Sequence, residues 1–328
     1  MWFFYLPVYV CYLWYSLRAR TMTFFTAANP GMYMGGFIDY SKYDVLIKIP
    51  EEVIPKTFLI TEEQPVEQIQ ELLSENKINF PFILKPDRGQ RGFAVEIIRN
   101  KEGLSTYLSK YKTILLVQEY IDLPLEFGVL YYRIPGEEKG AISSVVQKVF
   151  LKIKGDGKST LRSLIKHSER GQYYQELLEA RFADQIDDVL PIDEEMTLVE
   201  IGNHCKGATF FNRNSLINEQ LVDTFDEISH QIEGFYFGRY DLRCASIEDL
   251  YAGKVKIVEL NGTNSEPAHI YDPDMPLFKA YRFMFHHWKT IFRIGTGNHK
   301  LGVPYMPLKE AWRVTRSHYK RREKEVVS

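Results

Sequence analysis

The chain has 328 residues, of which 45% are hydrophobic and 26% charged, and a formal net charge of −2. This size and composition predict a globular protein of about two domains and exclude a polytopic membrane protein, a collagen-like chain and a largely disordered one. The near-neutral charge argues against a general nucleic-acid-binding protein, because phosphate contacts need a basic surplus. Cys11, Cys205 and Cys244 show no metal-ligand spacing, so a disulfide framework or zinc finger is not indicated, and a reducing, cytoplasmic location is favoured.

The first 20 residues form an aromatic segment with a basic end. Eight of the first 17 residues are aromatic and none is charged, and Arg18 and Arg20 follow. The segment is slightly short of the ~20 residues that span hydrocarbon, and it lacks the flanks of a signal peptide. Trp and Tyr favour the headgroup level of a bilayer, so one interpretation is a membrane anchor at the inner, cytoplasmic face. The alternative is an apolar segment that packs on the body or on a second copy in a homodimer; Pro7 would spoil a straight spanning helix.

The elements that follow alternate between helices and strands. Residues 21–60 show little helical periodicity. The patterns then predict, in chain order, a helix at 62–76, a strand at 80–86, a glycine-bearing loop at 87–92, a strand at 93–98, a helix at 102–110, strands at 113–120, 129–133 and 143–153, a largely helical region at 159–182, a helix at 215–232, and strands at 238–244 and 254–261. This order indicates an α+β protein.

Two predicted strands near residue 250 carry the densest set of charged and polar side chains. Side chains alternate along a strand, so Arg239 shares a face with Asp241, and Glu259 shares one with Asn261. The short connection between the strands allows them to pair, which would form a wall of hard oxygen ligands and one arginine, suited to magnesium and phosphate. The alternative is a solvated sheet face with an ordinary ion pair.

An earlier strand and loop favour the phosphate interpretation. Lys85 ends an apolar strand and is followed by a loop that contains Gly89 and Gly92. Glycines let backbone N–H groups approach phosphate oxygens, and the lysine supplies a positive charge. Another apolar strand ends at Glu119, and Glu126 follows seven residues later, where carboxylates could bind adenine or ribose.

The order of these motifs resembles one family. Ile-Leu-Lys85-Pro, the glycine loop, Val-Gln-Glu119-Tyr, Leu-Glu126-Phe-Gly, Gly-Arg239-Tyr-Asp241 and Glu259-Leu-Asn261-Gly look like the ATP-grasp carboxylate–amine ligases, whose members include D-alanine–D-alanine ligase and cyanophycin synthetase. The resemblance covers about residues 54–265 and implies the ATP-grasp fold, in which two α+β lobes clasp ATP.

The resemblance also implies residue roles, by position in the motifs. Lys85 and the loop with Gly89 and Gly92 would contact the ATP phosphates, Glu119 with the backbone of Tyr120 and Ile121 would take the adenine, and Glu126 the ribose. Asp241, Glu259 and Asn261 would hold two Mg²⁺ ions, or Mn²⁺, and Arg239 would touch the transferring phosphate. His204, Lys206 and Arg213 match no motif, and catalytic roles for His204 and Lys206 rest on their position alone.

The chain departs from the family at both ends. The usual N-terminal Rossmann-like domain is reduced, which leaves the substrate pocket undefined by the resemblance. We predict an aromatic segment at 1–20, a shortened N-terminal lobe at 21–79, a central subdomain at 80–120, a C-terminal subdomain at 121–275 and a helical extension at 276–328. In that extension, aromatic and basic stripes run side by side along a helix at 276–293, and a basic helix at 311–325 follows. Such a surface suits an anionic membrane; the alternative is a helix that docks its aromatic residues on the body.

The resemblance implies an ATP-dependent carboxylate–amine ligase that works through an acyl phosphate with Mg²⁺ and releases ADP and phosphate. Its substrates would be small-molecule or lipid-linked carboxylates and amines. Two alternatives stay open: a membrane-associated nucleotide-binding scaffold without ligase activity, and a kinase on the same fold.

Overall fold

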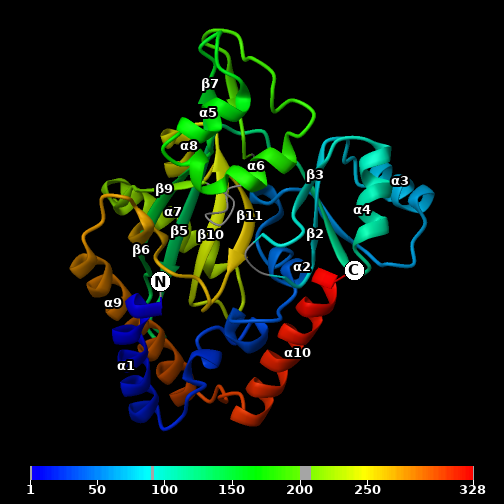
Figure 1. The fold of residues 1–328 in the computed structure, drawn as a ribbon. Helices are drawn as coiled ribbons and strands as arrows, with labels where there is room; N and C mark the ends of the chain where they lie inside the picture. The colour runs from blue at the N-terminus through cyan, green and yellow to red at the C-terminus, as the bar shows by residue number, and fades with distance from the viewer. Residues whose placement is uncertain (1, 90–91, 200–207, 328) are drawn as a thin grey trace.

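The computed structural model describes residues 2–89, 92–199 and 208–327, which build two antiparallel sheets covered by helices (Figure 1). The strands are β1 (Thr57–Ile60), β2 (Phe82–Pro86), β3 (Glu96–Ile98), β4 (Leu115–Glu119), β5 (Leu125–Tyr132), β6 (Ala141–Val149), β7 (Lys152–Lys154), β8 (Glu195–Thr197), β9 (Thr209–Asn212), β10 (Phe237–Cys244) and β11 (Val255–Asn261). The helices are α1 (Trp2–Ala19), α2 (Lys42–Leu46), α3 (Val66–Glu75), α4 (Lys101–Lys110), α5 (Leu161–His167), α6 (Gln175–Arg181), α7 (Glu219–His230), α8 (Ile247–Tyr251), α9 (Leu277–Lys300) and α10 (Leu308–Val327).

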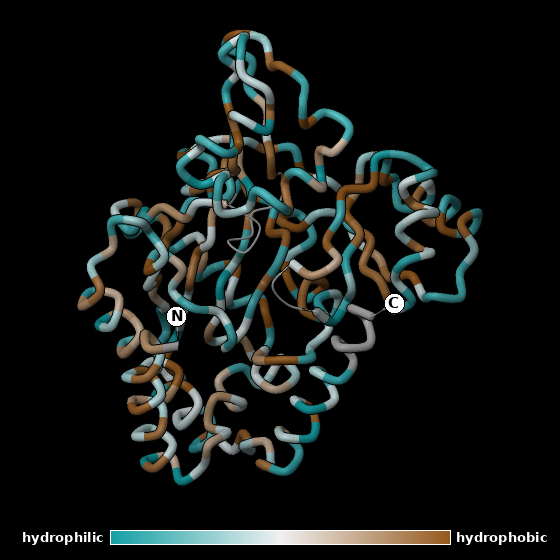
Figure 2. The backbone as a smooth tube through the Cα atoms, viewed as in Figure 1, coloured by the Kyte–Doolittle hydropathy of each residue, from teal (hydrophilic) through white to brown (hydrophobic). Residues whose placement is uncertain are grey.

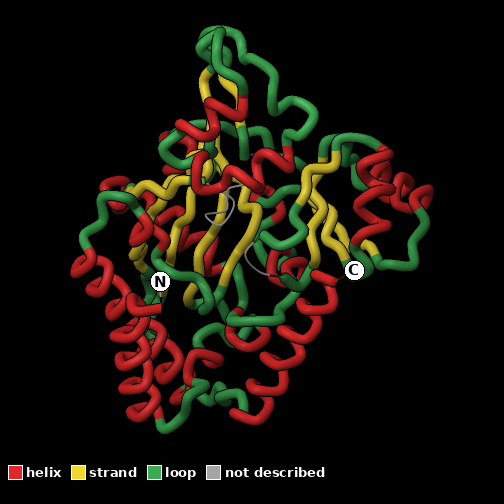
Figure 3. The backbone as a smooth tube through the Cα atoms, in the orientation of Figure 1, coloured by secondary structure: helices red, strands yellow, loops and turns green. Residues whose placement is uncertain are grey.

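The mixture of helices and antiparallel strands confirms the predicted α+β class (Figure 3). One sheet has the strand order β1-β4-β2-β3, the other has the order β11-β10-β5-β6-β9, and β7 pairs with β8. Most predicted elements lie within a few residues of the observed ones. Strand β1 lies in a region for which the sequence predicted no regular element, and it extends the smaller sheet by pairing with β4.

The predicted helical region at 159–182 is divided into two helices. Helix α5 ends where Ser168 adopts an extended conformation, and the Ser168 hydroxyl accepts a hydrogen bond from the Gly171 amide at 3.1 Å. A side chain at Gly171 would collide with the Ile165 carbonyl, so this glycine permits the tight turn into α6. The predicted strand at 143–153 is likewise divided into β6 and β7.

Each sheet has its own hydrophobic core. The smaller sheet packs its strands on α3 and α4 through residues such as Phe82, Ile69 and Leu104, and its strands are mainly hydrophobic (Figure 2). The larger sheet packs on α7 and α8, where Leu221, Phe225 and Leu250 are buried. Helix α7 is amphipathic and begins at Asn218, whose side chain caps it by accepting the Leu221 amide at 2.9 Å. The helices thus cover one face of each sheet, and the other faces, which carry polar side chains, border the region between the two sheets.

Helix α1 lies along α9, in the lower part of Figure 1. It runs through Pro7 without a break. Its aromatic residues stack on those of α9: Phe4 on Tyr281 with centroids 5.0 Å apart, and Tyr15 on Phe292 at 4.8 Å. One side of the aromatic segment therefore packs on the body, as one of the two interpretations expected. No helix in the described ranges combines the length and apolar character that crossing a bilayer requires.

A single buried asparagine ties the segment after α1 to the larger sheet. The Asn29 amide donates to the Gly35 carbonyl at 3.0 Å and to the Phe237 carbonyl at 2.7 Å. Its carbonyl oxygen accepts the amides of Tyr236 and Phe237, both at 2.9 Å. Asn29 is fully buried, so the amides of Tyr236 and Phe237 and the Phe237 carbonyl depend on it for these bonds, whereas the Gly35 carbonyl also accepts the Thr263 amide at 3.1 Å.

We predict that Asn29→Ala lowers the free energy of unfolding by about 3 kcal/mol, because buried backbone donors and acceptors lose their partners. Urea denaturation measures the change. Asn76→Ala is the control, since the Asn76 amide makes one partly buried bond, to the Leu72 carbonyl at 2.8 Å, and should cost less than about 1 kcal/mol. Equal losses in the two variants would contradict the role given to Asn29.

Candidate functional site

The polar wall predicted on two strands is present on the larger sheet. Strands β10 and β11 pair so that Arg239 lies opposite Asn261 and Asp241 lies opposite Glu259. The Arg239 guanidinium forms two bonds with the Asp241 carboxylate, 2.7 Å from Nε to Oδ1 and 3.1 Å from Nη2 to Oδ2. The Asn261 amide also donates to Asp241, at 3.3 Å. The structure thus brings together the four side chains that alternation along the strands placed on common faces.

A lysine that the sequence analysis did not select completes this cluster. Lys148 of β6 lies 3.2 Å from Asp241 and 3.2 Å from Glu126, and all three side chains are buried. Burial alone would raise the pKa of Asp241, but Arg239 and Lys148 outweigh it and lower the pKa to about 2. Burial would lower the pKa of Lys148, and Asp241 and Glu126 outweigh it and raise the pKa. Asp241 and Lys148 are therefore both charged at neutral pH.

Two further lysines reach the wall from the other side of the site. Lys85, at the end of β2, donates to the Gln118 side chain at 3.0 Å and to the Val258 carbonyl at 3.1 Å. Lys42, the first residue of α2, lies 3.5 Å from Glu259. Burial would raise the pKa of Glu259, but Lys42 and Lys85 lower it below its usual value. Strand β11 is thus the place where the two sheets meet through charged side chains.

The glycine loop after Lys85 is anchored to α2. The Asp87 carboxylate accepts the Ser41 hydroxyl at 2.9 Å and the Tyr43 amide at 3.0 Å. Lys42 also donates to the Gly89 carbonyl. Gly92 has a φ of 66°, a backbone conformation that favours glycine. The loop therefore starts from a fixed base beside two buried lysines.

Three of the four residues predicted to meet adenine and ribose, Tyr120, Ile121 and Glu126, lie around Arg243. Arg243 donates to Glu126 at 3.1 Å and to the Ile121 carbonyl at 2.7 Å, and its guanidinium lies 5.8 Å from the Tyr120 ring centroid. Glu126 is therefore held between Arg243 and Lys148. The Glu119 carboxylate accepts the Lys56 amide at 3.2 Å, so it contacts the chain just before β1.

The remaining candidates are placed as follows. His204 and Lys206 lie outside the described residues. Arg213 follows β9 and donates to the Gln147 side chain at 2.9 Å, on the strand that also carries Lys148.

Asp241, Glu259 and Asn261 provide the oxygen donors that suit Mg²⁺. The Asn261 carbonyl accepts the Tyr40 hydroxyl at 3.1 Å, which orients the amide oxygen. The donor chemistry fits a magnesium ion shared with phosphate oxygens. Within the described ranges, the candidate site included, no group of three or more His, Cys, Asp or Glu side chains is arranged to hold a metal, and the set here has two carboxylates and one amide.

Sequence reasoning missed Lys42, Lys148 and Arg243. The available signal for Lys148 was its place on the same strand face as Ile142 and Val146, since a lysine on a buried face needs a partner. Lys42 lies in a region without periodicity, and only the Ser41 cap marks the short helix that carries it. Both lysines act through contacts between distant segments, which spacing along the chain does not reveal.

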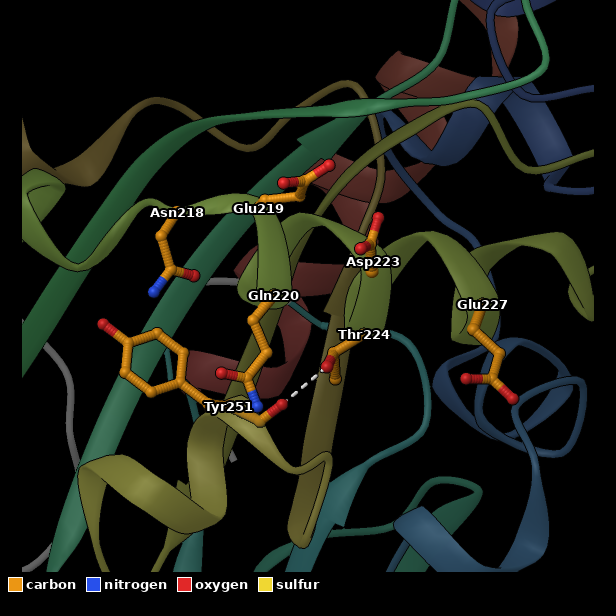
Figure 4. A pocket seen from close by; sticks show the side chains of 7 residues that line it. All are labelled: Asn218, Glu219, Gln220, Asp223, Thr224, Glu227 and Tyr251. Carbon is orange, nitrogen blue, oxygen red and sulfur yellow. Dashed lines mark hydrogen bonds between the residues drawn. The ribbon is translucent and has the colours of Figure 1, made fainter.

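A separate hollow lies on the outer side of α7, beside α8 (Figure 4). Its charged lining is acidic, with Glu219, Asp223 and Glu227, and the Thr224 hydroxyl donates to the Tyr251 carbonyl at 2.7 Å. It contains none of the predicted site residues, and its carboxylates would repel a polyphosphate. The charged wall, and not this hollow, is therefore the candidate site.

Residues 41–137 match the family model of the RimK-like ATP-grasp domain. The match begins at the cap of α2 and includes Lys85, Glu119 and Glu126. The predicted resemblance to the ATP-grasp family is thus confirmed over these residues.

The chain is also similar to solved structures of ligases. Against the VanG D-Ala:D-Ser ligase from Enterococcus faecalis the TM-score is 0.44 at 12% identity, over 78% of this chain and 61% of that one. Against the D-alanine–D-alanine ligase from Coxiella burnetii the TM-score is 0.46 at 9% identity, over 82% of this chain and 62% of that one. Against a bifunctional glutathione synthetase from Pasteurella multocida the TM-score is 0.36 at 15% identity, over 77% of this chain and 38% of that one. The chain thus spans less than two thirds of each of these three proteins, and no curated protein sequence matches it significantly.

Gly128 of β5 gives the cluster its space, and we predict that Gly128→Ala lowers the free energy of unfolding by about 2 kcal/mol. The new methyl carbon would lie 2.9 Å from Val146 Cγ1, 3.1 Å from Arg239 Cδ and 3.2 Å from Asp241 Oδ1. Thermal and urea denaturation measure the loss. Gly89→Ala is the matched control, because among the described residues its methyl group would meet only Pro86, at 3.7 Å. Equal stability of the two variants would show that the cluster tolerates a side chain at Gly128.

Proposed function

We propose that this protein is an ATP-dependent carboxylate–amine ligase. The observation that supports this most is the largely buried cluster in which Lys42, Lys85, Lys148 and Arg239 surround the carboxylates of Asp241 and Glu259. Because these cations outnumber the two carboxylates, the cluster favours the binding of a polyphosphate. The adjacent oxygen ligands favour the binding of the metal ion that accompanies the polyphosphate. The ATP-grasp domain at 41–137 is consistent with this assignment.

In the proposed complex, the subdomains at 80–120 and 121–275 clasp ATP between the two sheets. Lys85, Lys148 and the glycine loop bind the phosphates, with Lys42 beside them. The backbone at Tyr120 and Ile121 contacts the adenine, and Glu126 contacts the ribose. Asp241, Glu259 and Asn261 would hold Mg²⁺, two ions or their Mn²⁺ equivalents, which would neutralise charge on the phosphates.

The proposed reaction has two steps. A carboxylate oxygen of the first substrate attacks the γ-phosphorus of ATP, the bond to the β-phosphate oxygen breaks, and ADP leaves with that electron pair. An amine then attacks the acyl carbon, phosphate leaves, and the nitrogen loses a proton to give the amide. Arg239 stabilises the charge on the transferring phosphate, and positioning supplies most of the catalysis. We propose that the substrates are small-molecule or lipid-linked carboxylates and amines and that the reaction takes place in the cytoplasm.

We predict that Glu259→Gln lowers substrate-dependent ADP release by about 100-fold or more, because one charge that holds the metal is removed. The assay measures ADP and phosphate release against a panel of carboxylates and amines. Glu227→Gln, on the exposed side of α7, is the control and should keep wild-type turnover. Undiminished turnover in Glu259→Gln would overturn the metal assignment.

The same assay separates the alternatives. ATP binding without ADP formation across the panel would indicate a nucleotide-binding scaffold. A stable phosphorylated product in place of an amide would indicate a kinase.

The pH dependence of ATP binding tests the role of Lys85. Burial, opposed in part by Glu259, lowers the pKa of Lys85 to about 8. Because the charged lysine binds phosphate and its charged fraction falls from about one half to about one eleventh, ATP affinity should fall about fivefold between pH 8 and pH 9. Titration calorimetry with a non-hydrolysable ATP analogue measures this. In Lys85→Arg the guanidinium stays charged, so the fall should disappear; an equally steep fall would exclude Lys85 as its cause.

A further inference from the structure

The outer face of α1 is an exposed apolar stripe. Its inner face is used by the packing on α9, yet Phe3, Leu6, Val10, Leu13 and Leu17 repeat at intervals of three and four on the opposite side and are each at least half exposed. The stripe is flanked by exposed Tyr9 and Trp14, and Leu277 and Phe278 at the start of α9 are also exposed. A contiguous surface of this kind on a folded protein marks an interaction site. We refer to these nine residues as the α1 face.

The charged side chains of the two helices that form the α1 face all have one sign. Helices α1 and α9 contain no Asp or Glu, whereas α1 carries Arg18 and α9 carries five basic residues, all exposed: Lys279, Arg282, Lys289, Arg293 and Lys300. Within the described residues, Arg293 alone among these six forms an ion pair with a carboxylate, that of Glu137 at 3.4 Å. A partner of the α1 face must therefore be apolar and negatively charged.

We propose that the α1 face binds the surface of an anionic lipid bilayer. Trp and Tyr side chains favour the headgroup level, the leucines and phenylalanines enter the acyl boundary, and the arginines and lysines contact anionic headgroups. A second copy of the chain is disfavoured as the partner, because two carboxylate-free helix pairs would repel each other.

The contacts on the inner face of α1 make deletion of this helix unsuitable as a test. The Tyr5 hydroxyl donates to Glu266 at 3.0 Å, and the Glu266 carbonyl accepts Arg239 of the candidate site at 3.4 Å. Removing α1 would therefore disturb both the core and the site. Point substitutions on the exposed stripe avoid this problem.

The test is co-sedimentation with vesicles of phosphatidylcholine containing about one third phosphatidylglycerol, compared with phosphatidylcholine alone. The wild-type chain should bind the anionic vesicles at least tenfold more tightly than the neutral ones. The double variant Leu13→Ser/Leu17→Ser removes two side chains that are 50% and 75% exposed and should weaken binding about tenfold or more. Lys279→Gln/Arg282→Gln should weaken binding to anionic vesicles by a similar factor and leave binding to neutral vesicles unchanged.

A matched control lies at the far end of the molecule. Leu177 and Ile192 are 52% and 72% exposed, in the region of α6 and the β7–β8 pair at the top of Figure 1, whereas α1 lies at the bottom. Leu177→Ser/Ile192→Ser should bind like the wild type, and circular dichroism checks that all variants are folded. Failure of the wild-type chain to sediment, or equal loss in the control, would overturn the proposal. So would a dimer in light scattering that Leu13→Ser/Leu17→Ser dissociates without any vesicle binding by the wild type, since the partner would then be a second copy.

Discussion

The pairing of the buried Asp241 carboxylate with Arg239 and Lys148 is the interaction on which the site depends. An isolated charge at this depth would cost several kcal/mol, so the carboxylate requires cations on both sides. They come from different strands: Arg239 from β10 itself and Lys148 from β6, with β5 between them in the sheet. Gly128 of β5 leaves the room in which they meet. The charge pairing in the site therefore depends on the strand order of the larger sheet, which places β6 and β10 on either side of β5.

The second constraint is the junction between the two sheets. Lys85 and Lys42 come from the smaller sheet and from α2, and both end on β11, at the Val258 carbonyl and the Glu259 carboxylate. Their ammonium groups lie among protein acceptors that phosphate oxygens could replace at little cost, because the cations are already desolvated. Each half of the site is thus incomplete without the other, which is the arrangement that a ligand clasped between two lobes requires.

The ends of the chain extend this body in a different way. Helix α1 is apolar on two sides, and only one of them is covered, by the aromatic residues of α9. From the sequence, packing on the body and contact with a membrane were alternative interpretations of this segment. In the structure the two faces of one helix allow both, because residues three and four apart on a helix share a face and the intervening residues point elsewhere.

Period-two alternation in 238–244 and 254–261 was enough to predict that Arg239, Asp241, Glu259 and Asn261 face one another. The glycine loop after Lys85 was likewise predicted from neighbouring residues in the sequence. The α+β class and the resemblance to ATP-grasp proteins followed from the order of such motifs. The roles of Lys148, Lys42 and Arg243 were decided only by the tertiary structure, since each pairs with a carboxylate about 90 to over 200 residues away: Asp241, Glu259 and Glu126, respectively. Local patterns report which face a side chain occupies, whereas the pairing of buried charges depends on which strands become neighbours, and that is a property of the whole fold.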